Sequence, residues 1–307
     1  MKNVVLNNGV EMPMVGLGTF LIPKENLSQT IAQAYELGYR KFGTAWRYHN
    51  EREISEALKE NGIKREDVFI TTKINADAFY VNKYWEGKHK IFNIRKFRSI
   101  DSVIEESFQN LQTDYIDLFL VHWPWPMYQN MYKGLTRFYK AGRIRAIGVC
   151  SCSPCQIVAL NDVSDVLPAV NQFEISPLNT QHKLVEWCKS KNIVPEAMST
   201  FSHFRSNVPR KEIIENEQIK PIAIKYGKSI PQVILRWLYQ RGISIIPKTW
   251  LYEHLKENIT IFDFALSDEE MSIIDSLDKG HCLNYDMYDK RISYVPRKSR
   301  DKGWFGV

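Results

Sequence analysis

Short apolar segments alternate with longer amphipathic segments along most of the chain. There are eight of the short segments, at residues 14–18, 39–43, 68–72, 116–121, 144–149, 169–172, 193–197 and 243–247. Runs of this length are typical of strands that are buried on both faces. The segments between them carry apolar residues at helical spacing, most clearly at residues 230–241, where Pro231 stands in the first turn. Strand and helix in regular alternation predict a parallel sheet, and eight such units predict a closed (β/α)8 TIM barrel of the α/β class.

An open, doubly wound sheet is the competing arrangement for alternating strands and helices. Its dinucleotide-binding form requires three glycines after the first strand. Gly16 and Gly18 match the first two, but Leu21 stands where the third is needed. The closed barrel is therefore favoured.

Both ends of the chain add elements to the barrel. An Asn-Asn-Gly turn at residues 7–9 separates two short apolar stretches, which predicts an N-terminal β-hairpin. Residues 267–270 have serine and glutamate at the spacing of a capping box, which predicts one more helix after the eighth unit. We expect a single domain over residues 1–307, with an enlarged loop at about 75–100 and a C-terminal extension at about 279–307 that lies over the barrel.

Composition narrows the class of protein only modestly. The chain has 307 residues, 44% of them hydrophobic, and a net charge of +6, which falls short of the basic balance of a dedicated nucleic-acid binder. Five cysteines do not make an even disulfide framework, so we expect free thiols and a cytoplasmic location. The first residues lack the apolar stretch of a signal peptide, and no apolar run is long enough to span a membrane. We expect neither a membrane nor a nucleic-acid partner.

Reactive side chains follow most of the predicted strands. In a (β/α)8 barrel, the active site forms from the loops at the carboxyl ends of the strands. Tyr48 follows the second strand, Lys73 the third and His122 the fourth. Any one of them alone would most often be a packing or surface residue, but three at adjacent strand ends predict a site for proton transfer.

Several motifs at these strand ends resemble those of the aldo-keto reductase family. They are Gly-Thr-Ala-x-x-Tyr-x-Asn-Glu (43–51), Thr-Thr-Lys (71–73), Val-His-Trp-Pro (121–124), Arg-Ala-Ile-Gly-Val (145–149), Val-Asn-Gln-Phe-Glu (170–174) and Ile-Pro-Lys-Thr (246–249). The resemblance implies reduction of an aldehyde or ketone to an alcohol with hydride from NAD(P)H, which this family binds without a Rossmann motif. Tyr48 would donate the proton, Lys73 would favour the phenolate that forms, and His122 would orient the carbonyl.

One catalytic position departs from the family. The aspartate that pairs with the lysine is replaced by Gly43, which marks a divergent member. Removing one partner of a buried ion pair leaves the other charge uncompensated, which is costly. Asp77 is a candidate substitute on the grounds of its position in the sequence.

The coenzyme positions that the resemblance implies are retained in part. They are Cys150, Ser151, Gln172, Met198, Ser199, Lys248, Thr249, His254 and Asn258. Gln172, Lys248, Thr249 and Asn258 match the family. Cys150 and Ser151 replace Ser-Asn, Met198 replaces a tyrosine that stacks on the nicotinamide ring, and His254 replaces an arginine that binds the 2′-phosphate. NADPH is the implied coenzyme because Lys248 favours a phosphate, and NADH stays as the alternative.

Aromatic residues near the same strand ends predict the substrate pocket. They are Phe20, Trp46, Trp123 and Trp125. Such a wall suits a small-molecule carbonyl compound that is apolar or aromatic. Basic and aromatic residues over 79–98 predict a lid at the mouth, which suits a large or anionic substrate. The cysteines at 150, 152 and 155 fit a strand end that leads into a helix, and no metal site is predicted.

These patterns leave more than one function open. One is a reductase that acts as a monomer, as is common in the family. Another is a non-redox acid–base enzyme for dehydration, isomerisation or cyclisation, which keeps Tyr48 and His122 on a barrel with a degraded nicotinamide site. A third is a binding protein with little catalysis. The matches at Gln172, Lys248 and Asn258 favour the reductase.

Overall fold

The strands form the expected barrel. The structure is a computed structural model that describes residues 2–79, 98–202 and 208–280. Eight parallel strands pair in chain order: β3 (Leu17–Gly18), β4 (Lys41–Gly43), β5 (Phe69–Ile74), β6 (Ile116–Val121), β7 (Ile144–Cys150), β8 (Val170–Glu174), β9 (Val194–Met198) and β10 (Ser244–Ile245). Backbone hydrogen bonds from Ile245 N to Met14 O (2.8 Å) and from Gly16 N to Ile245 O (2.9 Å) join the last strand to the first. The (β/α)8 prediction is therefore confirmed.

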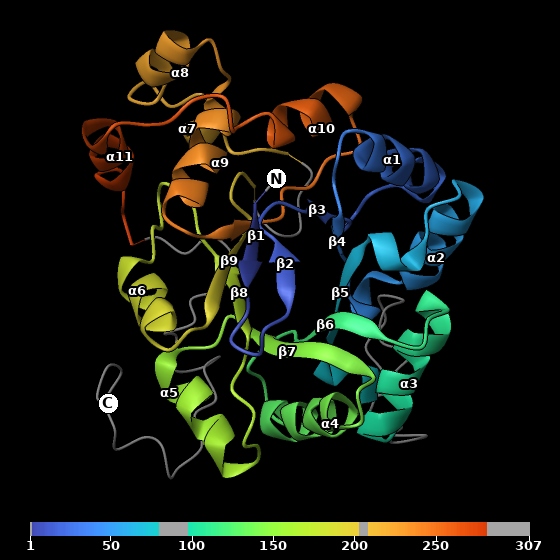
Figure 1. Cartoon of the computed structure of the whole chain (residues 1–307). Coiled ribbons are helices and arrows are strands. Elements are labelled where there is room, and N and C mark those ends of the chain that lie inside the picture. Colours follow the sequence, from blue (N-terminus) through green and yellow to red (C-terminus); the bar gives the residue numbers. More distant parts are fainter. Residues whose placement is uncertain (1, 80–97, 203–207, 281–307) are drawn as a thin grey trace, which may run out of the picture.

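Helices surround the ring of strands (Figure 1). They are α1 (Lys24–Glu36), α2 (Glu51–Glu60), α3 (Ile100–Leu111), α4 (Tyr128–Lys140), α5 (Pro154–Val158), α6 (His182–Ser190), α7 (Lys211–Ile214), α8 (Lys220–Tyr226), α9 (Ile230–Gln240), α10 (Tyr252–Ile259) and α11 (Asp268–Asp275). Short 3₁₀ helices lie at Trp46–Tyr48, Arg65–Asp67, Ala76–Phe79 and Ala159–Asp162. Ser229 caps α9 ahead of Pro231, and Ser267 forms the expected capping box with Glu270 at the start of α11.

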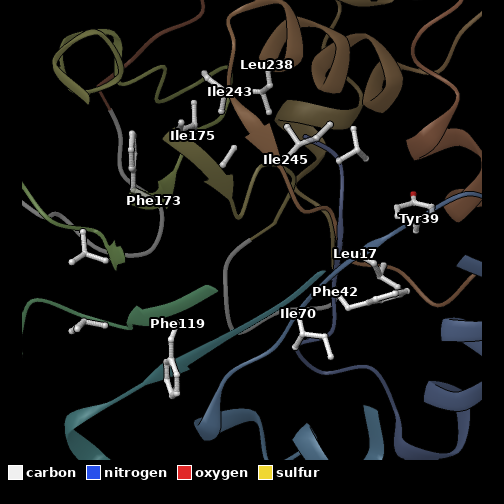
Figure 2. Packing of buried hydrophobic residues seen from close by; sticks show 14 of the residues in the cluster. Leu17, Tyr39, Phe42, Ile70, Phe119, Phe173, Ile175, Leu238, Ile243 and Ile245 are labelled. Carbon is white, nitrogen blue, oxygen red and sulfur yellow. The ribbon is translucent and has the colours of Figure 1, made fainter. Parts of the chain in front are cut away.

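The apolar core has two parts. The larger lies between the strands and the helices, and Figure 2 shows Phe42, Ile70 and Phe119 projecting into it from β4, β5 and β6. The smaller fills the inside of the barrel with Leu118, Leu120 and residues of the neighbouring strands. Strands buried on both faces explain why the segments read as continuous apolar runs.

The predicted N-terminal hairpin closes one end of the barrel. Its strands are β1 (Asn3–Val5) and β2 (Glu11–Pro13), and Figure 1 shows them across the opening. Leu6 and Met12 pack into the inner core, and Asn8 donates to the backbone oxygen of Arg145 beside the start of β7 (2.8 Å). The hairpin therefore covers the amino ends of the strands and leaves their carboxyl ends for a site. The predicted C-terminal extension from 281 and most of the enlarged loop, 80–97, lie outside the described residues.

Strand limits differ from the predicted ones mainly at the barrel seam. The segments at 14–18 and 243–247 contribute only two strand residues each, and an isolated bridge between Val15 and Ile245 joins the two segments. By contrast, β5 continues beyond residue 72, since Lys73 and Ile74 still pair with β6. Lys73 therefore lies inside its strand.

Candidate active site

A rigid turn after β4 positions Tyr48. The 3₁₀ helix Trp46–Tyr48 begins after extended Ala45 and ends at His49, which adopts a left-handed conformation with φ 53°. Buried Asn50 anchors the turn, since it accepts from Thr44 Oγ1 (2.5 Å) and donates to the backbone oxygen of Thr19 (3.1 Å). The Tyr48 ring is therefore held at the barrel mouth, where it is partly exposed.

Tyr48, Lys73 and His122 lie together at the carboxyl ends of β4, β5 and β6. Lys73 Nζ is 5.1 Å from the centre of the Tyr48 ring. The ring centres of Tyr48 and His122 are 5.7 Å apart with an edge-on angle of 74°. Lys73 and His122 are 1% and 5% exposed, so the tyrosine is the most accessible of the three. The arrangement presents a phenol to the solvent side and surrounds it with a buried cation and an imidazole.

The Gly43 departure changes what Lys73 contacts. Lys73 Nζ donates to the backbone oxygen of Thr44 (2.8 Å). Gly43 lies on the neighbouring strand in register with Thr71, and its side chain position would face the same interior as Lys73. The side chain of Asp77, the candidate substitute, lies outside the described residues. Among the described residues, the ammonium therefore donates a hydrogen bond to a backbone carbonyl.

His122 is held in its neutral form. Burial, and then the positive charges of Lys73 and Arg47, keep the pKa of His122 well below its ordinary value of 6.5. Among the described residues, its buried Nδ1 has no hydrogen-bond partner. A neutral imidazole offers one N–H donor and one acceptor nitrogen. Sequence reasoning missed the influence of Arg47, although its place directly before Tyr48 was a signal for it.

Aromatic rings extend the site to one side. The rings of Phe20 and Tyr48 are 4.5 Å apart, and those of His122 and Trp123 are 5.5 Å apart and nearly parallel. Trp125 stacks on Trp123 at 6.1 Å. All five of these rings belong to residues that were predicted for the pocket or for catalysis. Trp46 instead directs its indole N–H to Glu106 of α3 (2.8 Å), and its place in the pocket stays a prediction.

The predicted nicotinamide residues gather at the ends of β7, β8 and β9. Cys150 ends β7, and its Sγ lies 4.0 Å from Gln172 Oε1 on β8. Ser151 donates its backbone N–H to the backbone oxygen of Gln172 (2.9 Å) and has φ 52°, while Ser199 after Met198 has φ 55°. Left-handed backbone at non-glycine residues is sparsely populated and is enriched at functional sites. Ser151 and Ser199 therefore carry strained backbone directly after β7 and β9.

The predicted adenosine residues lie near the end of β10 and on α10. Lys248 is partly buried, burial lowers its pKa, and its Nζ is 5.0 Å from the centre of the Trp250 ring. Thr249 Oγ1 accepts from the backbone of Leu251 (3.1 Å). On α10, Asn258 is buried and His254 is exposed. The contact between Lys248 and Trp250 was missed, since a tryptophan two residues from a lysine carries no functional signal by itself.

Three of the cysteines are buried. Cys150, Cys152 and Cys188 are free thiols, and burial raises the pKa of each. Within the described ranges, no three histidine, cysteine or acidic side chains are placed to hold a metal ion. Every helix in the part of the chain that the structure describes is too short or too polar to cross a bilayer.

The fold and site together define a (β/α)8 barrel with a tyrosine, a lysine and a histidine gathered at three adjacent strand ends. The model of the aldo/keto reductase family matches residues 14–279. Glyoxal reductase of Bacillus subtilis (strain 168) is 38% identical over 279 residues, which cover 90% of this chain and 92% of that protein. The chain belongs to the aldo/keto reductase family.

Solved structures agree with this assignment. The aldo-keto reductase MGS-M4 from a Medee basin deep-sea metagenome library matches with a TM-score of 0.80 and 33% identity, covering 95% of this chain and 99% of that one. An aldo-keto reductase of Bombyx mori in complex with NADP matches with a TM-score of 0.79 and 29% identity, covering 94% of this chain and 96% of that one. The likeness extends over nearly the full length of both proteins.

Proposed function

We propose that this protein reduces an aldehyde or ketone to an alcohol with NADPH, with Tyr48 as the proton donor. The observation that carries the proposal is the position of the partly exposed Tyr48 phenol between buried Lys73 and neutral His122. Membership of the aldo/keto reductase family supports it, as does the similarity to a glyoxal reductase.

The reaction needs one proton at the carbonyl oxygen. Tyr48 donates this proton through its hydroxyl, and the phenolate that remains is stabilised by the Lys73 ammonium 5.1 Å from the ring centre. Solvent then returns the proton, because Tyr48 is partly exposed. The carbonyl carbon receives hydride, which is what a bound nicotinamide coenzyme supplies.

His122 orients the carbonyl group. Since burial and the neighbouring cations lower its pKa, the imidazole is neutral at pH 7 and donates one N–H without competing with Tyr48 as an acid. The parallel indoles of Trp123 and Trp125 give the substrate an apolar wall. A small-molecule carbonyl compound with an apolar or aromatic substituent fits this combination.

The residues at the other strand ends fit a nicotinamide coenzyme. Gln172 is 2% exposed, and its Oε1 faces the weakly polar Cys150 thiol at 4.0 Å, so a strong donor from a ligand would improve its hydrogen bonding. Gln172 and Ser151 would hold the carboxamide, and Lys248 and Asn258 the adenosine phosphate end. The complex of the Bombyx mori relative with NADP supports NADPH over NADH.

A non-redox acid–base reaction is the second candidate, and Gly43 is the observation that favours it. Without the aspartate, the proton-transfer residues persist while the usual counter-charge of Lys73 is lost. This candidate predicts that nicotinamide coenzymes do not bind. A titration followed by tryptophan fluorescence or calorimetry therefore separates the two.

The experiment uses the purified full chain with NADPH and, separately, NADH. Micromolar NADPH binding, followed by NADPH oxidation in a screen of aldehydes and ketones, supports the reductase. The Tyr48→Phe variant is then expected to bind NADPH within about twofold of the original and to lose about 100-fold or more in kcat. Absence of binding at millimolar coenzyme refutes the reductase and favours the non-redox enzyme.

We further propose that residues 1–307 form a single catalytic domain that acts as a cytoplasmic monomer. One continuous apolar core runs from Val15 on the barrel seam to Ile274 in α11, which supports a single folding unit. Size-exclusion chromatography with light scattering tests the monomer, and a dimer mass would refute it.

A further inference from the structure

Four polar side chains meet inside the barrel, below the candidate site. Lys41 of β4 donates to Glu196 of β9 and to Ser244 of β10, both at 2.6 Å. Ser244 also donates to Glu196 (2.8 Å), and Gln172 of β8 donates its amide group to Glu196 Oε1 (2.7 Å). Exposure of the four side chains is 0–2%. The candidate reaction, as described above, uses only Gln172 of this cluster.

The electrostatics of the cluster keep Glu196 ionised. Burial by itself raises the pKa of Glu196, but the Lys41 charge and the hydrogen bonds from Lys41, Gln172 and Ser244 outweigh it and lower the pKa. Burial lowers the pKa of Lys41, and the charge of Glu196 opposes that effect. Glu196 is thus a carboxylate that accepts hydrogen bonds from three donors, and one of these is its ion-pair partner Lys41 at 2.6 Å.

An ionised carboxylate decides how the Gln172 amide is oriented. A carboxylate only accepts hydrogen bonds, whereas a glutamine amide has an NH₂ group that donates and an oxygen that accepts. The NH₂ group of Gln172 must therefore face Glu196 Oε1, which leaves Oε1 of Gln172 on the other side, towards Cys150. If Glu196 were neutral or an amide, both orientations of Gln172 would be satisfied.

We propose that Glu196 is a positioning residue for coenzyme recognition, which fixes Gln172 so that its oxygen is presented to the N–H donors of the nicotinamide carboxamide. The inference rests on the proposed function, because it requires that Gln172 contact this group. Glu196 touches neither coenzyme nor substrate and acts only through Gln172. Its separation from Gln172 by 24 residues, and from Lys41 by 155, hides the arrangement from sequence patterns.

Binding of two ligands tests this role without any measurement of activity. NADPH contains the nicotinamide, whereas 2′-phospho-ADP-ribose contains the adenosine half alone. Glu196→Gln is expected to raise the Kd of NADPH about tenfold, the equivalent of one hydrogen bond, and to leave the Kd of 2′-phospho-ADP-ribose within about twofold. The fragment thus reports whether the variant is folded.

Four further variants isolate the effect. Lys41→Met combined with Glu196→Gln removes the stranded ammonium and is expected to show the same tenfold, NADPH-specific loss. Gln172→Met is expected to show the same NADPH-specific loss of affinity. Adding Glu196→Gln to Gln172→Met should change the Kd of NADPH no further. Ser244→Ala, which removes a hydrogen bond from the same cluster but keeps the carboxylate, is the control and should leave the ratio of the two Kd values within about twofold.

The outcomes are distinct. Equal loss of both ligands in Glu196→Gln and in the double variant with Lys41→Met would mean a general structural role and would overturn the inference, as would no change in either ligand. In both cases the proposed function would stand, because the original protein binds both ligands. If the original protein binds neither at millimolar concentration, the proposed function fails and this inference fails with it.

Discussion

Replacing Gly43 by aspartate would restore a carboxylate to the barrel mouth. A Cβ added at Gly43 would lie 3.6 Å from Ile246 Cδ1 and 3.8 Å from the Leu17 oxygen, which are ordinary van der Waals contacts. The backbone of Gly43 is not left-handed, so a side chain brings no conformational strain. The new side chain would project inward beside Lys73, whose ammonium now donates to the oxygen of Thr44.

The size of the effect follows from this contact. A hydrogen bond to a charged group contributes about 1.5–3 kcal/mol, and desolvation of the new carboxylate offsets part of it. We expect about 1.4 kcal/mol to remain and to stabilise the transition state, because the Lys73 ammonium is held more firmly while the phenolate forms. This gain corresponds to roughly tenfold in rate. We therefore expect Gly43→Asp to raise kcat/KM for carbonyl reduction about tenfold.

Steady-state NADPH oxidation with a responsive aldehyde measures this prediction. Gly43→Asn is the matched control, because it has the same shape without the charge, and Gly43→Ala tests the space for a Cβ alone. Both controls should stay within about twofold of the original enzyme. The reasoning is refuted if asparagine raises kcat/KM as much as aspartate, or if aspartate lowers it while the protein stays folded.

Three further predictions concern charge. In the folded protein the pKa of His122 lies below its ordinary value of 6.5, so the unfolded state binds more protons below that pH and stability should fall as pH falls through 6.5. His122→Asn should flatten this part of the curve of unfolding free energy against pH. Asp117 is fully buried between Arg65 and Arg145, at 2.7 Å from each, and the two arginines stay partly exposed, so Asp117→Ala should cost about 1–3 kcal/mol in urea unfolding, and a loss below about 0.5 kcal/mol would contradict the burial argument. Lys248→Met should weaken NADPH binding about tenfold and NADH binding less than twofold, and equal losses in calorimetry would exclude a phosphate contact.

The length and period of the apolar runs predicted most of the barrel. The run at 116–121 is β6 residue for residue, because a strand buried on both faces contains hardly any polar position that would obscure its limits. The start of α9 was equally plain, since Pro231 in the first turn is a local signal. The predicted and observed strand limits disagree at β3 and β10, where each strand has only two residues at the barrel seam. No local pattern reports how the last strand meets the first.

Placement of Tyr48, Lys73 and His122 could be predicted because parallel strands in one barrel end at the same edge. Each of them lies near or just beyond the carboxyl end of its strand, so the order of elements alone brings them close. The neutral state of His122 could not be predicted, since it depends on burial and on the positive charges of Lys73 and Arg47, which come from other elements.

By itself, the sequence determined the class of fold and the group of side chains at the barrel mouth, because periodicity and strand ends are local properties of the chain. Only the tertiary structure decided how these groups are charged and oriented. Lys41 and Glu196 are 155 residues apart, and they form an ion pair only because closure of the barrel brings β4 and β9 around one interior. The low dielectric and the exclusion of water in that interior then strengthen the hydrogen bond through which Glu196 orients Gln172. The residues next to them in the sequence give no sign of this contact.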